Sequence, residues 1–106
     1  MNKLIETITF CKRIGALEPG FDRVKEALDA GRVQLVLLAS DLSPKTEKEL
    51  LFVCGRTAVP AVKTGLTQDE YWYLIGKRSG VIGVTNPAFA EKIRSVIESG
   101  QTDQEK

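Results

Sequence analysis

A short run of apolar positions near the middle of the chain gives the clearest structural signal. Six of the seven residues from 33 to 39 are apolar, with Gly31 before the run and Ser40 and Asp41 after it. Such a run predicts a strand covered on both faces, as in a parallel or mixed sheet with helices above and below. We therefore expect residues 32–41 to hold the central strand, with Ser40 and Asp41 at the sheet edge where open α/β proteins tend to bind ligands.

Apolar residues recur at helical spacing on both sides of this strand. A first amphipathic helix is predicted over residues 2–14 and a second over residues 21–30, with Gly15 and Gly31 as stop signals. The first two helices are expected to turn these residues inward: Leu4, Ile8 and Cys11, then Val24, Ala27 and Leu28.

Three later helices carry recognisable start signals. Ser43 and Pro44 open the third, Thr67 and Glu70 form a capping box for the fourth, and Asn86 opens the last. Gly55 is expected to close the third helix and Gly100 the last. The predicted apolar faces are Leu50, Leu51, Val53 and Cys54, then Tyr71, Leu74 and Ile75, then Phe89, Ile93, Val96 and Ile97.

Short strands complete the pattern. Residues 81–84 predict a second buried strand. Residues 59–62 predict a short strand, and Pro60 indicates either an edge strand or the start of a strand, because proline cannot donate to a ladder. Residues 17–20 leave room for at most a very short strand. Helices thus alternate with strands, which predicts a single-domain three-layer α/β/α sandwich around a small mixed sheet. We expect this domain to span residues 1–100, followed by a polar, frayed tail at residues 101–106.

Composition narrows the classes of function. The net charge of +1 argues against a general polyelectrolyte binder, although one local basic patch remains possible. Cys11 and Cys54 each lie in a helical apolar pattern, so we expect buried reduced thiols. No apolar run approaches the roughly 20 residues of a membrane span, and the amino terminus lacks an apolar signal core, so the expected location is cytoplasmic.

Enzyme signatures are weak. The chain has no histidine, which removes the commonest general base and transition-metal ligand. Asp41 lacks the neighbouring carboxylates that a phospho-acceptor aspartate uses to hold magnesium. Residues 76–78 lack the spacing of a phosphate-binding loop, and there is no Cys-x-x-Cys pair. We expect no enzymatic activity, no cofactor and no metal.

Two glycine-containing loops are better candidates for binding. Residues 20–25 join an irregular turn to a helix start, where backbone amides suit a phosphate or a base-edge acceptor. Residues 76–80 place Lys77 and Arg78 on a glycine-flanked turn, which allows close approach and phosphate contacts. The alternative is that both are ordinary solvated loops.

The order of these motifs resembles the kink-turn-binding ribosomal protein family, the L-seven-Ae and L-thirty-e superfamily, and most of all its small bacterial members. The resemblance covers roughly residues 8–97. The motifs that carry it begin with Gly20 before a helix and with the central strand, and continue through Val59 and Pro60 to residues 75–77 and 81–85. It implies an α/β/α sandwich that recognises RNA kink-turns without catalysis, through the start of the second helix and the loop before the last strand.

The usual recognition motif of that family is Gly, any residue, Asn or Lys, Glu or Gln, two further residues, then Lys. Aligned by distance to the central strand, it begins at Gly20 and ends at Glu26. Asp22 stands at the amide or lysine position, Arg23 at the Glu or Gln position, and Glu26 at the phosphate-facing lysine. Arginine cannot accept a hydrogen bond from a guanine edge, because guanidinium only donates. The resemblance therefore implies a diverged recognition motif.

The function implied is binding of structured RNA, ribosomal or kink-turn-like, by a ribosome-associated protein. The alternative is a protein-interaction module on the same fold, with residues 71–73 as its aromatic evidence. A locally positive face favours RNA, and a neutral face beside an exposed Trp72 favours a protein partner. The candidate RNA-binding residues are Gly20, Phe21, Asp22, Arg23, Lys25, Glu26, Lys77, Arg78 and Ser79.

Overall fold

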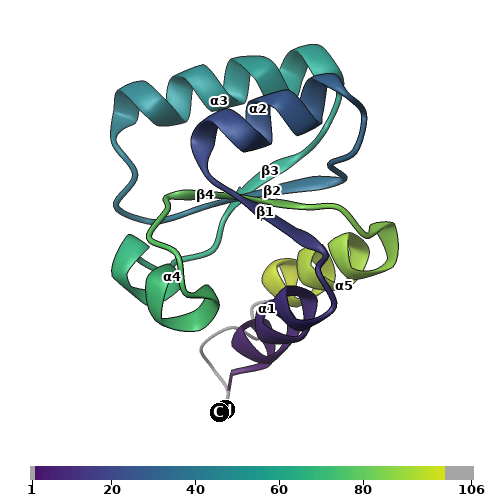
Figure 1. Cartoon of the computed structure of the whole chain (residues 1–106), viewed down its shortest axis with the longest axis vertical. Helices are drawn as coiled ribbons and strands as arrows, with labels where there is room; N and C mark the ends of the chain where they lie inside the picture. Colours follow the sequence, from purple (N-terminus) through teal and green to yellow (C-terminus); the bar gives the residue numbers. More distant parts are fainter. Residues whose placement is uncertain (1, 100–106) are drawn as a thin grey trace.

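In a computed structural model of the chain, which describes residues 2–99, the strands form one mixed sheet in the order β1–β4–β2–β3 (Figure 1). The bounds are β1 Leu17–Pro19, β2 Leu35–Leu38, β3 Ala61–Lys63 and β4 Val81–Val84. β4 runs antiparallel to β1 and β2, and β3 runs parallel to β2. The predicted mixed sheet and its central strand are confirmed, and β3 lies at an edge as Pro60 indicates.

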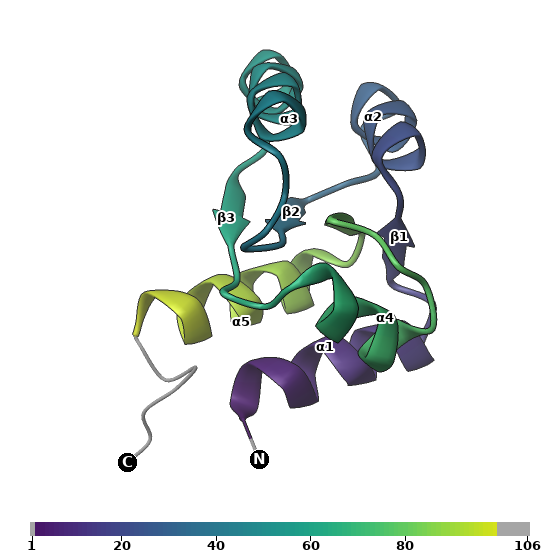
Figure 2. The ribbon, with the colours of Figure 1, turned by 90° about the vertical axis from the view of Figure 1, so that its left-hand side faces the viewer.

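Helices cover both faces of this sheet, as the alternating pattern predicts. α2 (Phe21–Asp29) and α3 (Pro44–Thr57) lie on one face. α1 (Lys3–Arg13), α4 (Gln68–Ile75) and α5 (Pro87–Glu98) lie on the other (Figures 1 and 2). Leu35 and Leu37 of β2 point to the three-helix side, while Val36 and Leu38 point to the two-helix side. Both faces of the central strand are therefore buried.

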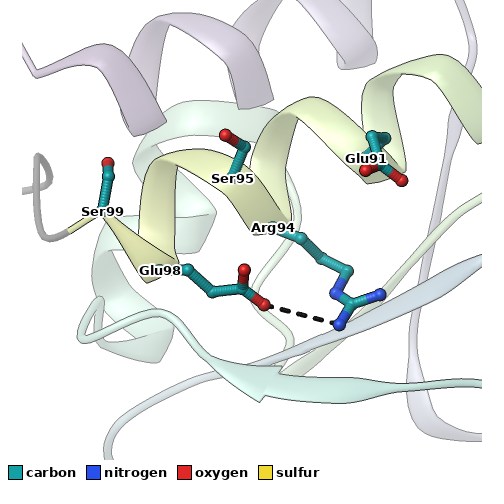
Figure 3. Close-up of a pocket in the computed structure, with 5 residues that line it drawn as sticks. All are labelled: Glu91, Arg94, Ser95, Glu98 and Ser99. Atoms are coloured by element: carbon teal, nitrogen blue, oxygen red, sulfur yellow. Dashed lines mark hydrogen bonds and ion pairs between the residues drawn. The ribbon is translucent and has the colours of Figure 1, made fainter.

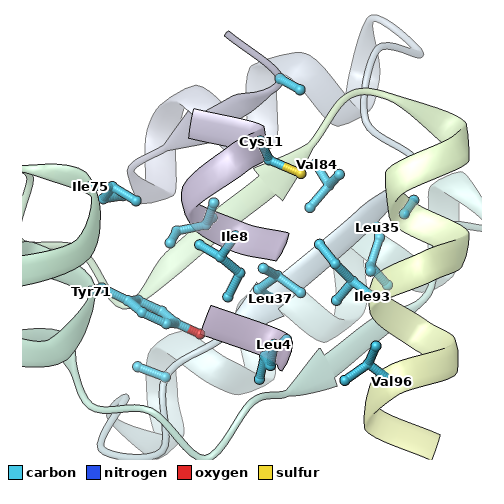
Figure 4. Packing of buried hydrophobic residues seen from close by; sticks show 14 residues of the cluster. Leu4, Ile8, Cys11, Leu35, Leu37, Tyr71, Ile75, Val84, Ile93 and Val96 are labelled. Atoms are coloured by element: carbon cyan, nitrogen blue, oxygen red, sulfur yellow. The ribbon is translucent and has the colours of Figure 1, made fainter. Parts of the chain in front are cut away.

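The larger core lies between the sheet and α1, α4 and α5 (Figure 4). It contains the fully buried ring of Tyr71, whose hydroxyl forms a 2.6 Å hydrogen bond with Thr64 Oγ1. Cys11 lies in this core and Cys54 in the other, and neither forms a disulfide, as predicted. Burial raises the pKa of both thiols. Both residues pack as small apolar side chains.

Helix starts follow the predicted caps. Thr67 Oγ1 accepts a hydrogen bond from the Glu70 amide at 3.2 Å, and Glu70 Oε1 accepts one from the Thr67 amide at 2.8 Å. The side-chain oxygens of Ser43 and Asn86 cap α3 and α5. Asp41 also contributes, because its carboxylate accepts a hydrogen bond from the Gln68 amide at 3.0 Å. Asp41 thus fixes the start of α4 against the β2–α3 loop.

The predictions for α3 need two corrections. Leu51 was expected to face the core, but its side chain is 45% exposed. The buried stripe is Leu50, Val53 and Cys54, and Leu51 projects about 100° away from Leu50 around the helix. Gly55 does not close the helix, which continues to Thr57 because the amides of Ala58 and Val59 satisfy the last carbonyls.

The other boundaries differ by one or two residues. α2 ends at Asp29 rather than residue 30, and the edge strand spans 61–63 rather than 59–62. Leu74, Phe89 and Ile97 are partly buried and pack against the core. The predicted stop at Gly100 and the tail at residues 101–106 lie outside the described residues.

Candidate functional site

One end of the sheet gathers the two loops that the sequence singles out. Because β1 and β2 both run antiparallel to β4, their carboxyl ends lie beside the start of β4. Pro19 pairs with Ile82, and Leu38 pairs with Val81. The turn into α2 and the loop at residues 76–80 therefore meet at this end, which faces the viewer in Figure 2.

A single backbone carbonyl joins the two loops. The oxygen of Val81 accepts a hydrogen bond from the Gly20 amide at 2.9 Å and another from the Ser79 hydroxyl at 2.8 Å. The Ala39 amide donates to the Gly80 carbonyl at 2.9 Å, which ties the same loop to the end of β2. Segments distant in the sequence thus form one continuous surface.

Three small residues set the shape of this surface. Gly20 has a φ of 111° and a ψ of 137°, a conformation that L-residues rarely adopt. Gly80 packs so closely that a Cβ there would lie 2.6 Å from Cδ1 of Leu42. Ser79 is buried, and its hydroxyl also accepts from the Val81 amide at 3.1 Å. Ser79 therefore shapes the loop, and its hydroxyl is engaged within it.

Most cations on this surface are held by carboxylates. Arg23 pairs with Glu18 at 3.1 Å, Lys25 pairs with Glu49 at 3.5 Å, and Arg78 pairs with Asp69. Lys25 also lies over the partly buried ring of Phe21, with its Nζ 5.1 Å from the ring centroid. Within residues 2–99, Lys77 has no carboxylate oxygen within 4 Å.

The surface carries both signs of charge. Asp22 and Glu26 are exposed, lie one helical turn apart and have no ion-pair partner among residues 2–99. This face is therefore not clearly positive, and charge alone does not favour RNA over a protein partner. The partners Glu18 and Asp69 were not predicted as part of this surface. Neither stands at a helical spacing from its arginine, so no periodic signal marks the pairs.

The aromatic run at residues 71–73 divides between core and surface. Tyr71 is buried and belongs to the core, so it cannot take part in an external contact. Trp72 is 58% exposed and Tyr73 is 88% exposed, on the helix that leads directly into the basic loop. Of these three aromatic residues, only Trp72 and Tyr73 are exposed.

Other parts of the described structure are weaker candidates for a functional site. A hollow on α5 is lined by side chains of that one helix, with Arg94 paired to Glu98 at 3.4 Å (Figure 3). Among residues 2–99, no group of three His, Cys, Asp or Glu side chains is placed to hold a metal ion. No helix in this part of the chain is long and apolar enough to cross a membrane.

Solved structures of two other proteins resemble this chain. A solved structure of a protein with unknown function from Bacillus halodurans C is 31% identical, covers 92% of this chain and 99% of its own, and has a TM-score of 0.86. A Giardia lamblia 15.5 kD RNA-binding protein shares the fold, with a TM-score of 0.74 at 16% identity over 91% of this chain and 85% of its own. No match was found among curated proteins.

The family comparison agrees with the resemblance drawn from the sequence motifs. The model of the ribosomal protein L7Ae/L30e/S12e/Gadd45 family matches residues 2–70, which include α1, the start of α2 and the central strand. The Bacillus halodurans relative extends the likeness over nearly the whole chain. This chain belongs to the ribosomal protein L7Ae/L30e/S12e/Gadd45 family.

Proposed function

We propose that this chain is a non-enzymatic protein that binds structured RNA through the joined surface of the α2 start and the α4–β4 loop. The observation that carries the proposal is the shared Val81 carbonyl, which fixes Gly20 and Ser79 side by side. Family membership and an RNA-binding structural neighbour support an RNA ligand. The RNA class we propose is a kink-turn-like element, on a ribosome-associated protein of the cytoplasm.

The two loops of this surface offer different kinds of contact to RNA. Gly20 brings the start of α2 against the loop, where the backbone amides of the first turn have no side-chain cap. These amides suit an acceptor on a phosphate or a base edge. Lys77, with no carboxylate partner in the described residues, is free to contact a phosphate without first breaking an ion pair. Arg23, Lys25 and Arg78 would exchange an existing carboxylate for the RNA.

The mixed charges predict how this binding depends on salt. Removing one cation that binds a phosphate should reduce the slope of log K against log salt by about 0.7–0.9. Because carboxylates already hold most of the cations, the wild-type slope should be shallow, as for a protein that binds few phosphates. Affinity should therefore depend more on the shape of the RNA than on its total charge.

The test measures binding to one kink-turn RNA and to a plain duplex of the same length. Lys77→Glu with Arg78→Glu should weaken kink-turn binding and reduce the salt slope. Lys92→Glu, an exposed residue on α5, is the single-site charge control and should change neither. Unchanged affinity and slope in the double variant would remove the loop from the site. Capture of a partner from lysate that survives nuclease treatment, without RNA binding, would instead indicate a protein-interaction module.

A further inference from the structure

The exposed face of α4 places an aromatic surface directly beside the basic loop. Trp72 and Tyr73 are 58% and 88% exposed, among the most exposed large apolar side chains of the described residues. Gly76 ends the helix with a φ of 76° and turns the chain into Lys77 and Arg78. In Figure 2 this helix lies at the same end of the sheet as the start of α2.

Core packing and capping already fix α4 in place. Tyr71 and Ile75 face the core, and the Tyr71 hydroxyl bonds to Thr64. At the start of the helix, Gln68 is held by Asp41 through its backbone amide at 3.0 Å and through its side-chain amide at 3.4 Å. Trp72 and Tyr73 contribute to neither arrangement. Their exposure is therefore not a by-product of holding the helix.

The surroundings of Trp72 are polar and open. Arg78 pairs with Asp69, which lies one helical turn before Trp72, so its guanidinium is held at the first turn of α4. Gly76, one turn after Trp72, has nothing within 4 Å of the position that a Cβ would take. The surface beyond Trp72 is thus open at Gly76, and the two cations Lys77 and Arg78 follow directly in the chain. Aromatic rings beside cations are the usual means of holding unpaired bases and their phosphates.

We propose that Trp72 stacks on an unpaired base of the RNA that the two loops bind, an inference that rests on the proposed function. Trp72 is a better platform than Tyr73, because its partly covered ring has less rotational freedom to lose on binding. Lys77 contacts the phosphate beside that base. The α4 surface thereby extends the interface from the two loops along one helix.

Binding should be measured with Trp72→Ala and Tyr73→Ala on the kink-turn RNA, and on copies in which each unpaired nucleotide in turn is made abasic. Trp72→Ala should weaken binding at least about tenfold, because stacking carries that much affinity per base. On the RNA copy that lacks the stacked base, Trp72→Ala should bind as tightly as the wild-type protein does. Tyr73→Ala should have a smaller effect. Phe52→Ala, a 70% exposed aromatic on α3, is the matched control and should change nothing.

Two further readouts separate stacking from charge. Trp72 is the single tryptophan of the chain, so its fluorescence reports directly on the ring. RNA should quench this fluorescence, and the copy without the stacked base should not. The salt slope should stay unchanged in Trp72→Ala, whereas Lys77→Glu should reduce it.

The outcomes distinguish this inference from the function on which it rests. If Trp72→Ala binds as wild type while the loop variant is weakened, the stacking role is wrong and the RNA-binding proposal stands. If the wild-type protein binds no RNA, both are overturned. A nuclease-resistant partner that requires Trp72 would assign the ring to a protein contact and overturn the stacking role.

Discussion

Gly20 occupies a backbone conformation that few other residues can adopt. Its φ of 111° would strain any side chain, although a Cβ there would make only ordinary van der Waals contact with the Arg23 side chain. Gly20→Ala should therefore lower the free energy of unfolding by about 1–3 kcal/mol. Gly55→Ala is the control, because Gly55 is exposed within α3 and its Cβ would meet nothing within 4 Å. That variant should gain about 0.5–1 kcal/mol. Chemical denaturation of both proteins checks the difference in sign.

Tyr71 makes stability sensitive to alkaline pH. Burial raises the pKa of its phenol well above the usual value; the Thr64 hydrogen bond opposes this, and the charges of Asp41 and Glu70 add to it. In the unfolded chain the phenol ionises near pH 10. The stabilising contribution is therefore complete below about pH 10 and is lost as pH rises further.

Tyr71→Phe should remove this part of the alkaline loss, so its stability should fall less than that of wild type above about pH 10. Tyr73→Phe is the control, because Tyr73 is 88% exposed and its variant should follow the wild-type curve. Urea denaturation at several pH values checks the prediction. Identical curves for all three proteins would show that Tyr71 does not govern the alkaline loss.

At the scale of elements, β2 and α3 allow one substitution to be compared in two environments. Leu37 on β2 is fully buried, whereas Leu51 on α3 is 45% exposed. Leu37→Ala should cost about 2–5 kcal/mol, as deletions in a packed core do. Leu51→Ala should cost less than about 1 kcal/mol. Similar losses in denaturation experiments would contradict this assignment of faces.

The first two turns of α2 carry two exposed negative charges on the surface that we propose to contact RNA. Asp22 and Glu26 are exposed, and like charges near phosphate are unfavourable. We expect the wild-type protein to bind a standard kink-turn only weakly. Asp22→Asn with Glu26→Lys should strengthen it at least about tenfold, or 1.4 kcal/mol. Calorimetry at fixed salt checks this, and tight wild-type binding would contradict it.

Arg23 is better left unchanged in that variant. Its guanidinium holds Glu18 at 3.1 Å, so Arg23→Glu would bring two carboxylates together. Adding this third change should therefore reduce the gain in RNA affinity. A further gain in RNA affinity would show that a carboxylate at position 23 favours RNA binding by more than the loss of the Arg23–Glu18 ion pair disfavours it.

Helix starts were the most predictable elements of this fold, because each depends on a few adjacent residues. Thr67 with Glu70 and Ser43 with Pro44 identify their helices without tertiary information. The end of α3 was not predictable in this way. Gly55 has the residue type of a stop, but hydrogen bonds made further along the chain carry the helix past it.

The candidate site was predictable as two loops but not as one surface. Glycine and basic residues identify each loop, whereas the link through Val81 depends on the antiparallel pairing of β1 with β4. The pairs of Arg23 with Glu18 and Arg78 with Asp69 likewise arise only after the chain has folded. The sequence could therefore locate the cations but not their neutralising partners.

At the scale of the whole molecule, the reactivity of the two buried thiols shows whether the two cores unfold together. Cys11 lies in the core under α1, and Cys54 lies in the core under α3. Burial raises both pKa values, so native protein should react slowly with a thiol reagent at pH 8. Both thiols should become reactive at the same urea concentration if the sheet and its helices unfold as one unit. Different midpoints for the two thiols of the wild-type protein would show separate unfolding of the layers.

The carbonyl of Val81 has a consequence for the kinetics of binding. Because the same oxygen holds Gly20 and Ser79, neither loop can swing outward without breaking a hydrogen bond at the end of the sheet. The free protein should therefore already have the shape that its ligand meets, with little backbone movement on binding. Association should then follow a single concentration-dependent step in stopped-flow experiments, and most variants should act by changing how long the complex lasts.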